Sequence, residues 1–344
     1  SINTFGQNFR TVWRTTAPNE TITIPTFASF GGVYNYTVDW GDGNSDAAQN
    51  GDATHTYAAA GDYTVTISGT FPRIYFNNAG DKDKIRSVEE WGSSIAWTSM
   101  ERAFRGCVNL VNNATDTPNL SGVLSLNSMF RDCDNISNGT ATNWNSWDTS
   151  NVTEMQQMFV SANSFNEDIS SWDVAKVTNM SGMFSGTSIN QNFGSWDVSS
   201  ATDLSSMFGS VSTLSIANYD ALLIGWSART LQNGVSFSGG LSKYNSQAAA
   251  DARANIIATY NWTINDFGRN STDITWTGAT NTDWNTESNW NTIVVPASAN
   301  NVTIPDVTNK PIISSTTYAR TNNITIGASG SLTIESGGSL KVFG

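Results

Sequence analysis

The sequence predicts a mainly β, multi-domain protein: a β-sandwich, a repeat solenoid with a short α-containing C-terminal cap, and a further β-rich module. Alternating apolar and polar runs fill the first 80 residues. A recurring phrase then ends five times in phenylalanine, at Phe104, Phe130, Phe159, Phe184 and Phe208. Short alternating runs separated by glycine return near the C-terminus. The predicted boundaries are 1–80, 81–211, 212–268 and 269–344.

Composition narrows the classes of partner and activity. The chain has 344 residues, too many for a single core, and a net charge of -12 with no run of lysine and arginine. This balance argues against nucleic acid and anionic membranes as partners. No apolar run approaches the roughly 20 residues that span a bilayer, so we expect no transmembrane segment. The single histidine, His55, leaves few routes to zinc or serine–histidine catalysis, and we expect no enzyme activity.

Three alternating runs predict strands in the N-terminal segment: Thr21–Ile24, Tyr34–Val38 and Tyr63–Ile67. Between them lie the phrases Asp39-Trp-Gly-Asp-Gly43 and Thr54-His-Thr-Tyr57. These phrases resemble the PKD (polycystic-kidney-disease) domain. The resemblance implies a small immunoglobulin-like sandwich that serves as a spacer or adhesive module in extracellular proteins, with a structural histidine.

The same turn carries the candidate metal ligands. Asp39, Asp42, Asn44 and Asp46 offer oxygen ligands at close spacing, which is the chemistry that calcium prefers. The loop lacks a closing bidentate glutamate, and Asx-rich turns form without any metal. Both interpretations stay open, and no other cofactor is expected.

The repeats are the most regular part of the sequence. Their phenylalanines recur at intervals of 26, 29, 25 and 24 residues, and a methionine precedes the phenylalanine in the last four copies. This period is typical of leucine-rich and related solenoids. A unit of this length cannot bury its own apolar face, so we expect methionine, phenylalanine and tryptophan to stack between neighbouring units.

Longer phrases carry a family resemblance. Ala103-Phe-Arg-Gly-Cys-Val-Asn-Leu110 and Val177-Thr-Asn-Met-Ser-Gly-Met-Phe184 are similar to the repeats of BspA-like leucine-rich-repeat surface proteins, in their Met-Phe/Trp-Asp variant. The resemblance covers residues 85–268. It implies a leucine-rich-repeat-like solenoid in a surface protein of Bacteroidetes type, exported to the outer cell surface by type IX secretion. We expect the chain to be a segment of a longer surface polypeptide.

Tryptophans at equivalent positions are candidate ligand-binding residues. Trp147, Trp172 and Trp196 form a stripe, which would bind sugar rings if it were exposed and would be core if it were buried. The buried ladder is the favoured interpretation, because repeated aromatics form the core of most solenoids. Trp144 falls outside the repeat slot and is expected to be the more exposed. The aspartate after each stripe tryptophan is expected to cap a turn.

Two cysteines occupy the same slot in adjacent repeats. Cys107 lies three residues after Phe104, and Cys133 three after Phe130. Because stacked strands lie about 4.8 Å apart, within the range of Cα separations that a disulfide accepts, we predict a Cys107–Cys133 disulfide. A pair of buried free thiols is the alternative.

The pattern changes after the repeats. Helical spacing begins at Tyr219, with Gly225 as a candidate helix breaker, and an alanine-rich helix follows Ser246 as N-cap. These helices are expected to cap the repeats. The module at 269–344 looks like the start of a β-solenoid or a β-sandwich of bacterial adhesins, and we expect it to be truncated.

Three functions follow from this organisation. The first is a non-enzymatic, adhesin-like segment of a secreted cell-surface protein that binds a glycan or surface protein. The alternative is a carbohydrate-binding accessory region of a polysaccharide-degrading system. A solenoid lyase is the weakest hypothesis, because such enzymes want clustered cations to meet uronate carboxylates, and the chain has 17 lysines and arginines in all.

Overall fold

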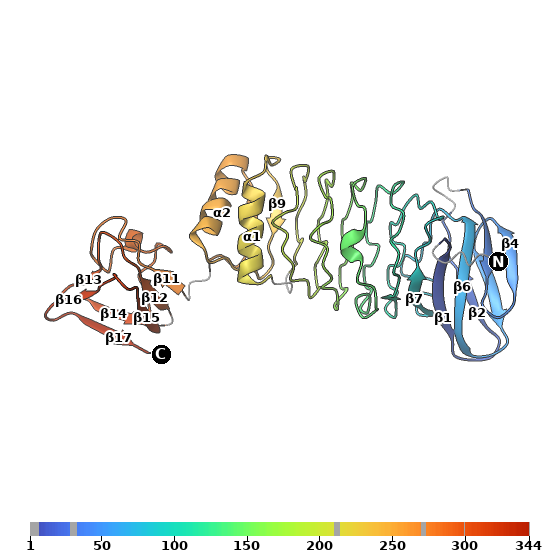
Figure 1. The fold of residues 1–344 in the computed structure, drawn as a ribbon, viewed down its shortest axis with the longest axis horizontal. Coiled ribbons are helices and arrows are strands. Elements are labelled where there is room, and N and C mark those ends of the chain that lie inside the picture. The colour runs from blue at the N-terminus through green and yellow to red at the C-terminus, as the bar shows by residue number, and fades with distance from the viewer. Residues whose placement is uncertain (1–6, 28–32, 210–213, 270–272, 299, 344) are drawn as a thin grey trace. The chain divides into compact units, whose positions relative to one another are not determined.

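The computed structural model describes residues 7–27, 33–209, 214–269, 273–298 and 300–343. It divides into two compact units. The first comprises residues 1–242 with 252–267, and the second comprises 243–251 with 268–344. Both are rich in short strands, which confirms a mainly β, multi-domain protein (Figure 1).

The N-terminal part of the first unit contains two sheets. Its strands are β1 (Phe9–Thr15), β2 (Glu20–Ile24), β3 (Asn35–Asp39), β4 (Ser45–Gln49), β5 (Ala53–Tyr57), β6 (Gly61–Thr70), β7 (Ile85–Glu90) and β8 (Val111–Asn112). One sheet has the order β4-β3-β6-β1-β7-β8, and β2 pairs with β5 in the other. Two of the strands predicted from alternation lie within β2 and β6, and the third, Tyr34–Val38, overlaps β3 but begins one residue earlier. Gly41 enables the β3–β4 turn, since its φ is +77° and an added Cβ would lie 2.4 Å from the Thr64 carbonyl oxygen.

The larger sheet crosses the predicted boundary at residue 80. Strand β1, which the pattern analysis missed, lies at its centre between β6 and β7. Strand β7 pairs antiparallel with β1 and parallel with β8, which belongs to the first repeat. The β7 segment therefore joins the sheet to the repeats and covers their first turn.

The repeats, residues 99–209, form a stack of turns joined by parallel backbone pairing, called here the repeat stack. Single parallel bridges link Ser125, Glu154, Asn179 and Asp203 in sequence. The phenylalanine amides continue the same register: Phe159 donates to the Met183 carbonyl at 3.0 Å, and equivalent bonds join the other turns. In Figure 1 the turns follow one another between β7 and the C-terminal helices.

Each turn bends through left-handed backbone at fixed places. The residue two before each phenylalanine has positive φ: Arg102 (55°), Ser128 (54°), Gln157 (56°), Gly182 (66°) and Ser206 (53°). The residue two after it repeats the feature in four turns: Gly106 (84°), Asp132 (61°), Ser161 (56°) and Gly186 (78°). Non-glycine residues rarely adopt this conformation, so its recurrence shows that the stacked geometry dictates the backbone.

An aromatic ladder fills the interior of the repeat stack. Ring centroids of successive repeat phenylalanines lie 5.5–6.0 Å apart and the rings are nearly parallel. Phe76, from the segment after β6, extends the ladder at 6.2 Å from Phe104. The methionine that precedes the phenylalanine in the last four copies is also fully buried. The predicted inward stacking of phenylalanine and methionine is confirmed.

Two helices and a small sheet follow the repeats, and the second helix begins in residues of the second unit and continues into the first. Helix α1 (Ile216–Ser227) is capped by Ser215, and α2 (Gln247–Tyr260) by Ser246, whose Oγ accepts from the Ala249 amide at 3.1 Å, as predicted. Strands β9 (Ser236–Ser238) and β10 (Thr263–Asn265) pair in parallel. Gly225 does not end α1. It lets the helix approach the last turns, since an added Cβ would lie 2.0 Å from the Gly194 carbonyl oxygen.

The second unit is built from parallel strand pairs. Its strands are β11 (Asp273–Thr275), β12 (Asn301–Ile304), β13 (Ile312–Ile313), β14 (Tyr318–Thr321), β15 (Asn323–Ile326), β16 (Thr333–Ile334) and β17 (Ser339–Val342). They pair as β11-β12-β15, β13-β16 and β14-β17, all in parallel. Trp276, Trp284 and Trp290 anchor the core. Parallel pairing differs from the antiparallel sheets of a β-sandwich, which was one of the two predicted folds.

Candidate functional site

In the acidic turn at residues 39–46, the aspartate side chains accept hydrogen bonds from neighbouring groups of the same turn. Asp39 accepts a hydrogen bond from the Gly41 amide at 3.0 Å, and Asp46 accepts one from the Trp40 indole at 2.8 Å. Asp42 accepts from the amide and side chain of Asn44. Within the described ranges no group of three or more acidic, histidine or cysteine side chains is placed to hold a metal ion. An Asx-rich turn accounts for this loop, and calcium binding stays a prediction.

His55 belongs to the same turn. Its Nε2 lies 2.8 Å from an Asp42 carboxylate oxygen, and its ring stacks on Trp40 at 5.1 Å. Burial alone would raise the pKa of Asp42, but the hydrogen bonds from His55 and Asn44 outweigh burial and lower it. The structure thus places the single histidine between an aromatic ring and a carboxylate, where it stabilises the turn.

The candidate tryptophans all lie inside the repeat stack. Trp144, Trp147, Trp172 and Trp196 are at most 3% exposed. The expectation that Trp144 is exposed is wrong, because its ring stacks on Trp147 at 4.9 Å and its carbonyl accepts from the Trp172 indole at 2.7 Å. The favoured buried ladder is correct, and these four residues do not form a surface for sugar rings.

The aspartates that follow the stripe tryptophans cap turns, as predicted. Asp148 accepts from the Ser150 amide at 3.1 Å, Asp173 from the Ala175 amide at 2.9 Å, and Asp197 from the Ser199 amide at 3.1 Å. Hydrogen bonds from Ser150, first from its side chain and then from its backbone amide, hold the pKa of Asp148 below its ordinary value. These carboxylates therefore stabilise the backbone of the turns.

The predicted disulfide is not formed. Cys107 and Cys133 are buried free thiols in adjacent turns. The Cys133 Sγ donates to the Phe104 carbonyl at 3.0 Å, so it is directed at the backbone of the neighbouring turn. Burial raises the pKa of both thiols well above the ordinary value, which keeps them protonated. The alternative of stacked thiols describes this structure.

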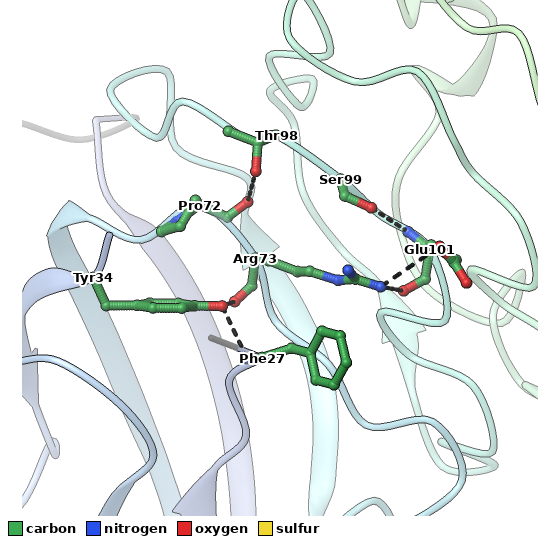
Figure 2. Close-up of a pocket in the computed structure, with 7 residues that line it drawn as sticks. All are labelled: Phe27, Tyr34, Pro72, Arg73, Thr98, Ser99 and Glu101. Atoms are coloured by element: carbon green, nitrogen blue, oxygen red, sulfur yellow. Dashed lines mark hydrogen bonds and ion pairs between the residues drawn. The ribbon is translucent and has the colours of Figure 1, made fainter. Parts of the chain in front are cut away.

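A pocket lies where the N-terminal sheets meet the first turn of the repeat stack. Figure 2 shows this junction pocket, a cavity of about 280 Å³. Its lining residues are Phe27, Tyr34, Pro72, Arg73, Thr98, Ser99 and Glu101. The Tyr34 hydroxyl donates to the Arg73 carbonyl and accepts from the Phe27 amide, both at 3.0 Å. The Thr98 hydroxyl bonds the Pro72 carbonyl at 3.4 Å.

Arg73 fastens the two sides of the junction pocket. Its guanidinium lies 5.1 Å from the ring centroid of Phe27 and 4.6 Å from that of Tyr75, and it donates to the Glu101 carbonyl at 2.8 Å. Burial lowers the pKa of Arg73. These contacts join the N-terminal sheets to the first turn, which is the arrangement of a structural joint.

The surface beside this joint carries three further arginines on the first two turns, called here the arginine row: Arg102, Arg105 and Arg131. Arg105 and Arg131 occupy the same slot, directly after Phe104 and Phe130. Arg102 and Arg105 contact the Tyr75 hydroxyl and the Asn77 side chain, which are two residues apart in the segment after β6. The three side chains are 40%, 28% and 29% exposed, so all are reachable from solvent.

The arginine row is only partly neutralised. The Nε atoms of Arg105 and Arg131 lie 4.0 Å and 3.6 Å from the same Asp132 oxygen, so two cations share one carboxylate. Arg102 lies 3.5 Å from Glu101. Three guanidinium groups thus face two carboxylates, on a chain whose net charge is -12. Like charges on adjacent turns repel, and an incoming anion would relieve that repulsion.

The sequence patterns do not reveal this cluster, because its members are dispersed along the chain. Arg105 and Arg131 are separated by 26 residues, as are their phenylalanines. Aligning the repeats on phenylalanine would have revealed the shared slot. The absence of a cationic run in the sequence therefore did not mean that the folded surface has no cationic cluster.

A wider hollow of about 450 Å³ lies beside β9 and β10. Its one carboxylate, Asp266, accepts from the Tyr219 hydroxyl at 2.6 Å and is paired with Arg253 at 2.9 Å. The side chain of Asp266 is 1% exposed. This network joins α1 to α2 and β10, and its charges compensate within the cap.

Family comparisons bear on the repeats and on the second unit. The repeats are similar to a family described as Mycoplasma protein of unknown function, DUF285. The matches cover residues 98–221 and 188–267. Residues 275–344 match a domain of unknown function, DUF8693. No curated protein and no solved structure matches the chain. The family boundaries follow the repeat stack with its cap and the second unit.

Proposed function

We propose that this chain is a non-enzymatic, adhesin-like segment of a secreted cell-surface protein that binds a glycan or a protein partner. The observation that carries the proposal is the separation of apolar and polar side chains between the interior and the exterior of the repeat stack. Its aromatic and methionine side chains fill the interior, while polar side chains bond from turn to turn outside, as when Asn163 donates to Asp134 at 2.9 Å. A rigid polar face with regular spacing is suited to recognition.

The architecture proposed from the sequence fits this function. The parallel rungs support a leucine-rich-repeat-like solenoid of the BspA-like kind, and the turn at Gly41 supports a PKD-like N-terminal module. The parallel strand pairs of the second unit support a β-solenoid there. Location at the outer cell surface, by type IX secretion, belongs to the same proposal. Within the described residues no helix has the length and apolarity to cross a membrane.

The structure removes the main support for the carbohydrate-binding alternative, which was the stacking of sugar rings on tryptophan. It required exposed tryptophans, and the four candidates are buried. The repeated aspartates that could resemble glycosidase carboxylates are turn caps instead. A glycan bound by this chain is therefore not held by these four tryptophans.

A co-sedimentation screen against insoluble polysaccharides and immobilised extracellular proteins tests the proposal. Each assay is run with calcium and with chelator, and the supernatant is assayed for released sugar. Saturable binding without product release is the expected result. Release of sugar in proportion to protein concentration would show an enzyme and overturn the proposal. Dependence of binding or folding on calcium would support the acidic turn as a metal site.

A further inference from the structure

We infer that the arginine row binds a polysaccharide bearing carboxylate or sulfate groups. The inference rests on the proposed binding function and names the ligand class and the site. Arg102, Arg105 and Arg131 supply it, on the first two turns of the repeat stack. The shared chemistry is a fixed oxyanion on a sugar chain.

The guanidinium groups have donors to spare. A guanidinium offers five N–H groups in a planar fork that matches a carboxylate or sulfate. In the part of the chain that the structure describes, each of the three donates a single side-chain hydrogen bond. The acceptors are the Tyr75 hydroxyl at 3.5 Å, the Asn77 amide oxygen at 3.3 Å and the Gln157 amide oxygen at 2.6 Å. These contacts orient the guanidinium groups and leave further N–H donors on their terminal nitrogens, while the Nε atoms of Arg105 and Arg131 are buried.

The spacing of the cations favours a chain over a single small anion. Arg105 and Arg131 stand in register on turns whose backbones pair directly: the Gly106 amide donates to the Arg131 carbonyl at 2.8 Å. The two charges are therefore offset by about one strand spacing, ~4.8 Å. A ligand with anionic groups repeated along its length can contact both guanidinium groups at once, each through a separate anionic group.

The surroundings favour a sugar over an acidic protein. Stable protein interfaces centre on buried apolar anchors. Besides the two carboxylates, the side chains that accept hydrogen bonds from the row are a phenol and two amides, from Tyr75, Asn77 and Gln157, all half-buried. These groups can bond sugar hydroxyls. The acidic remainder of the chain repels a polyanion, which confines its binding to this cluster.

The test measures binding of the full chain to polygalacturonate, chondroitin sulfate and neutral dextran at about 50 mM and 200 mM salt. The site variant is Arg105→Gln with Arg131→Gln. The control, Arg14→Gln with Arg320→Gln, removes the same charge from exposed sites elsewhere. Preference for polygalacturonate identifies carboxylate as the ligand group, and preference for chondroitin sulfate identifies sulfate.

We expect salt-sensitive binding to one acidic polysaccharide, weakened on the order of tenfold in the site variant and little changed in the control. Arg105→Lys with Arg131→Lys should restore part of the affinity, because lysine keeps the charge but loses the fork. Thermal melts confirm that the variants fold. Equal losses in site and control variants, or equally tight binding of single-stranded DNA, would overturn the inference. Binding only to neutral glycans or proteins would also overturn it while leaving the proposed function standing.

Discussion

Replacing Phe159 with alanine tests the aromatic ladder at its centre. Phe159 is 0% exposed. Its ring centroid lies 3.7 Å from the ring centroid of Phe165, 5.8 Å from that of Phe130 and 6.0 Å from that of Phe184. Removing a buried phenylalanine side chain costs about 3–5 kcal/mol, more where the surroundings cannot collapse. Here the rings above and below are held by backbone bonds between turns. We therefore expect a loss of about 4 kcal/mol in the free energy of unfolding.

Urea unfolding followed by tryptophan fluorescence measures this loss, since the tryptophans of the stack report on its packing. The melting temperature should fall by about 8–16 °C, at 2–4 °C per kcal/mol for a unit of this size. The control is Phe267→Ala, the same substitution at a side chain that is 60% exposed, which should change stability by less than about 0.5 kcal/mol. A loss below about 1.5 kcal/mol for Phe159→Ala, or equal losses at both positions, would refute the stacked interior.

Three further predictions follow from the same structure. A backbone amide and then a lysine ammonium donate hydrogen bonds to Glu20 and lower its pKa to about 2. The stability that ionised Glu20 contributes is therefore complete above its unfolded pKa of about 4.3 and is lost as the pH falls toward 2. The difference in melting temperature between wild type and Glu20→Gln should be smaller at pH 3 than at pH 7, and a pH-independent difference would contradict this. Cys107 and Cys133 should resist a thiol reagent in the native protein and both react after unfolding, and fast native labelling would show that they are accessible. Gly182→Ala should cost about 1 kcal/mol in urea unfolding, because alanine at a φ of +66° is strained; an unchanged midpoint would argue against the left-handed turn.

Sequence patterns predicted what depends on short-range periodicity. The spacing of the phenylalanines predicted the interior of the stack, and Ser246 was correctly expected to cap a helix. Trp144 was misjudged because its burial depends on Trp147 and on the Trp172 indole of the next turn. The thiol of Cys133 has a backbone acceptor that slot alignment cannot reveal.

The arginine row shows a different limit. Its charges meet only after two turns stack, so no window along the chain contains them together. Gly225 was taken as a helix breaker, because glycine has that meaning locally, while its role is close approach to the Gly194 backbone. Features that depend on two distant segments can be predicted from sequence only when the repeats are aligned with one another residue by residue.

Hydrogen exchange with and without an acidic polysaccharide tests the central functional claim most directly, because it locates the contact on the intact chain. With polygalacturonate or chondroitin sulfate present, exchange should slow in peptides covering 73–78, 99–106, 127–133 and 155–158, and should stay unchanged in the second unit. Protection confined to the second unit or the cap, or no protection at saturating polysaccharide, would contradict the assignment of ligand binding to the arginine row.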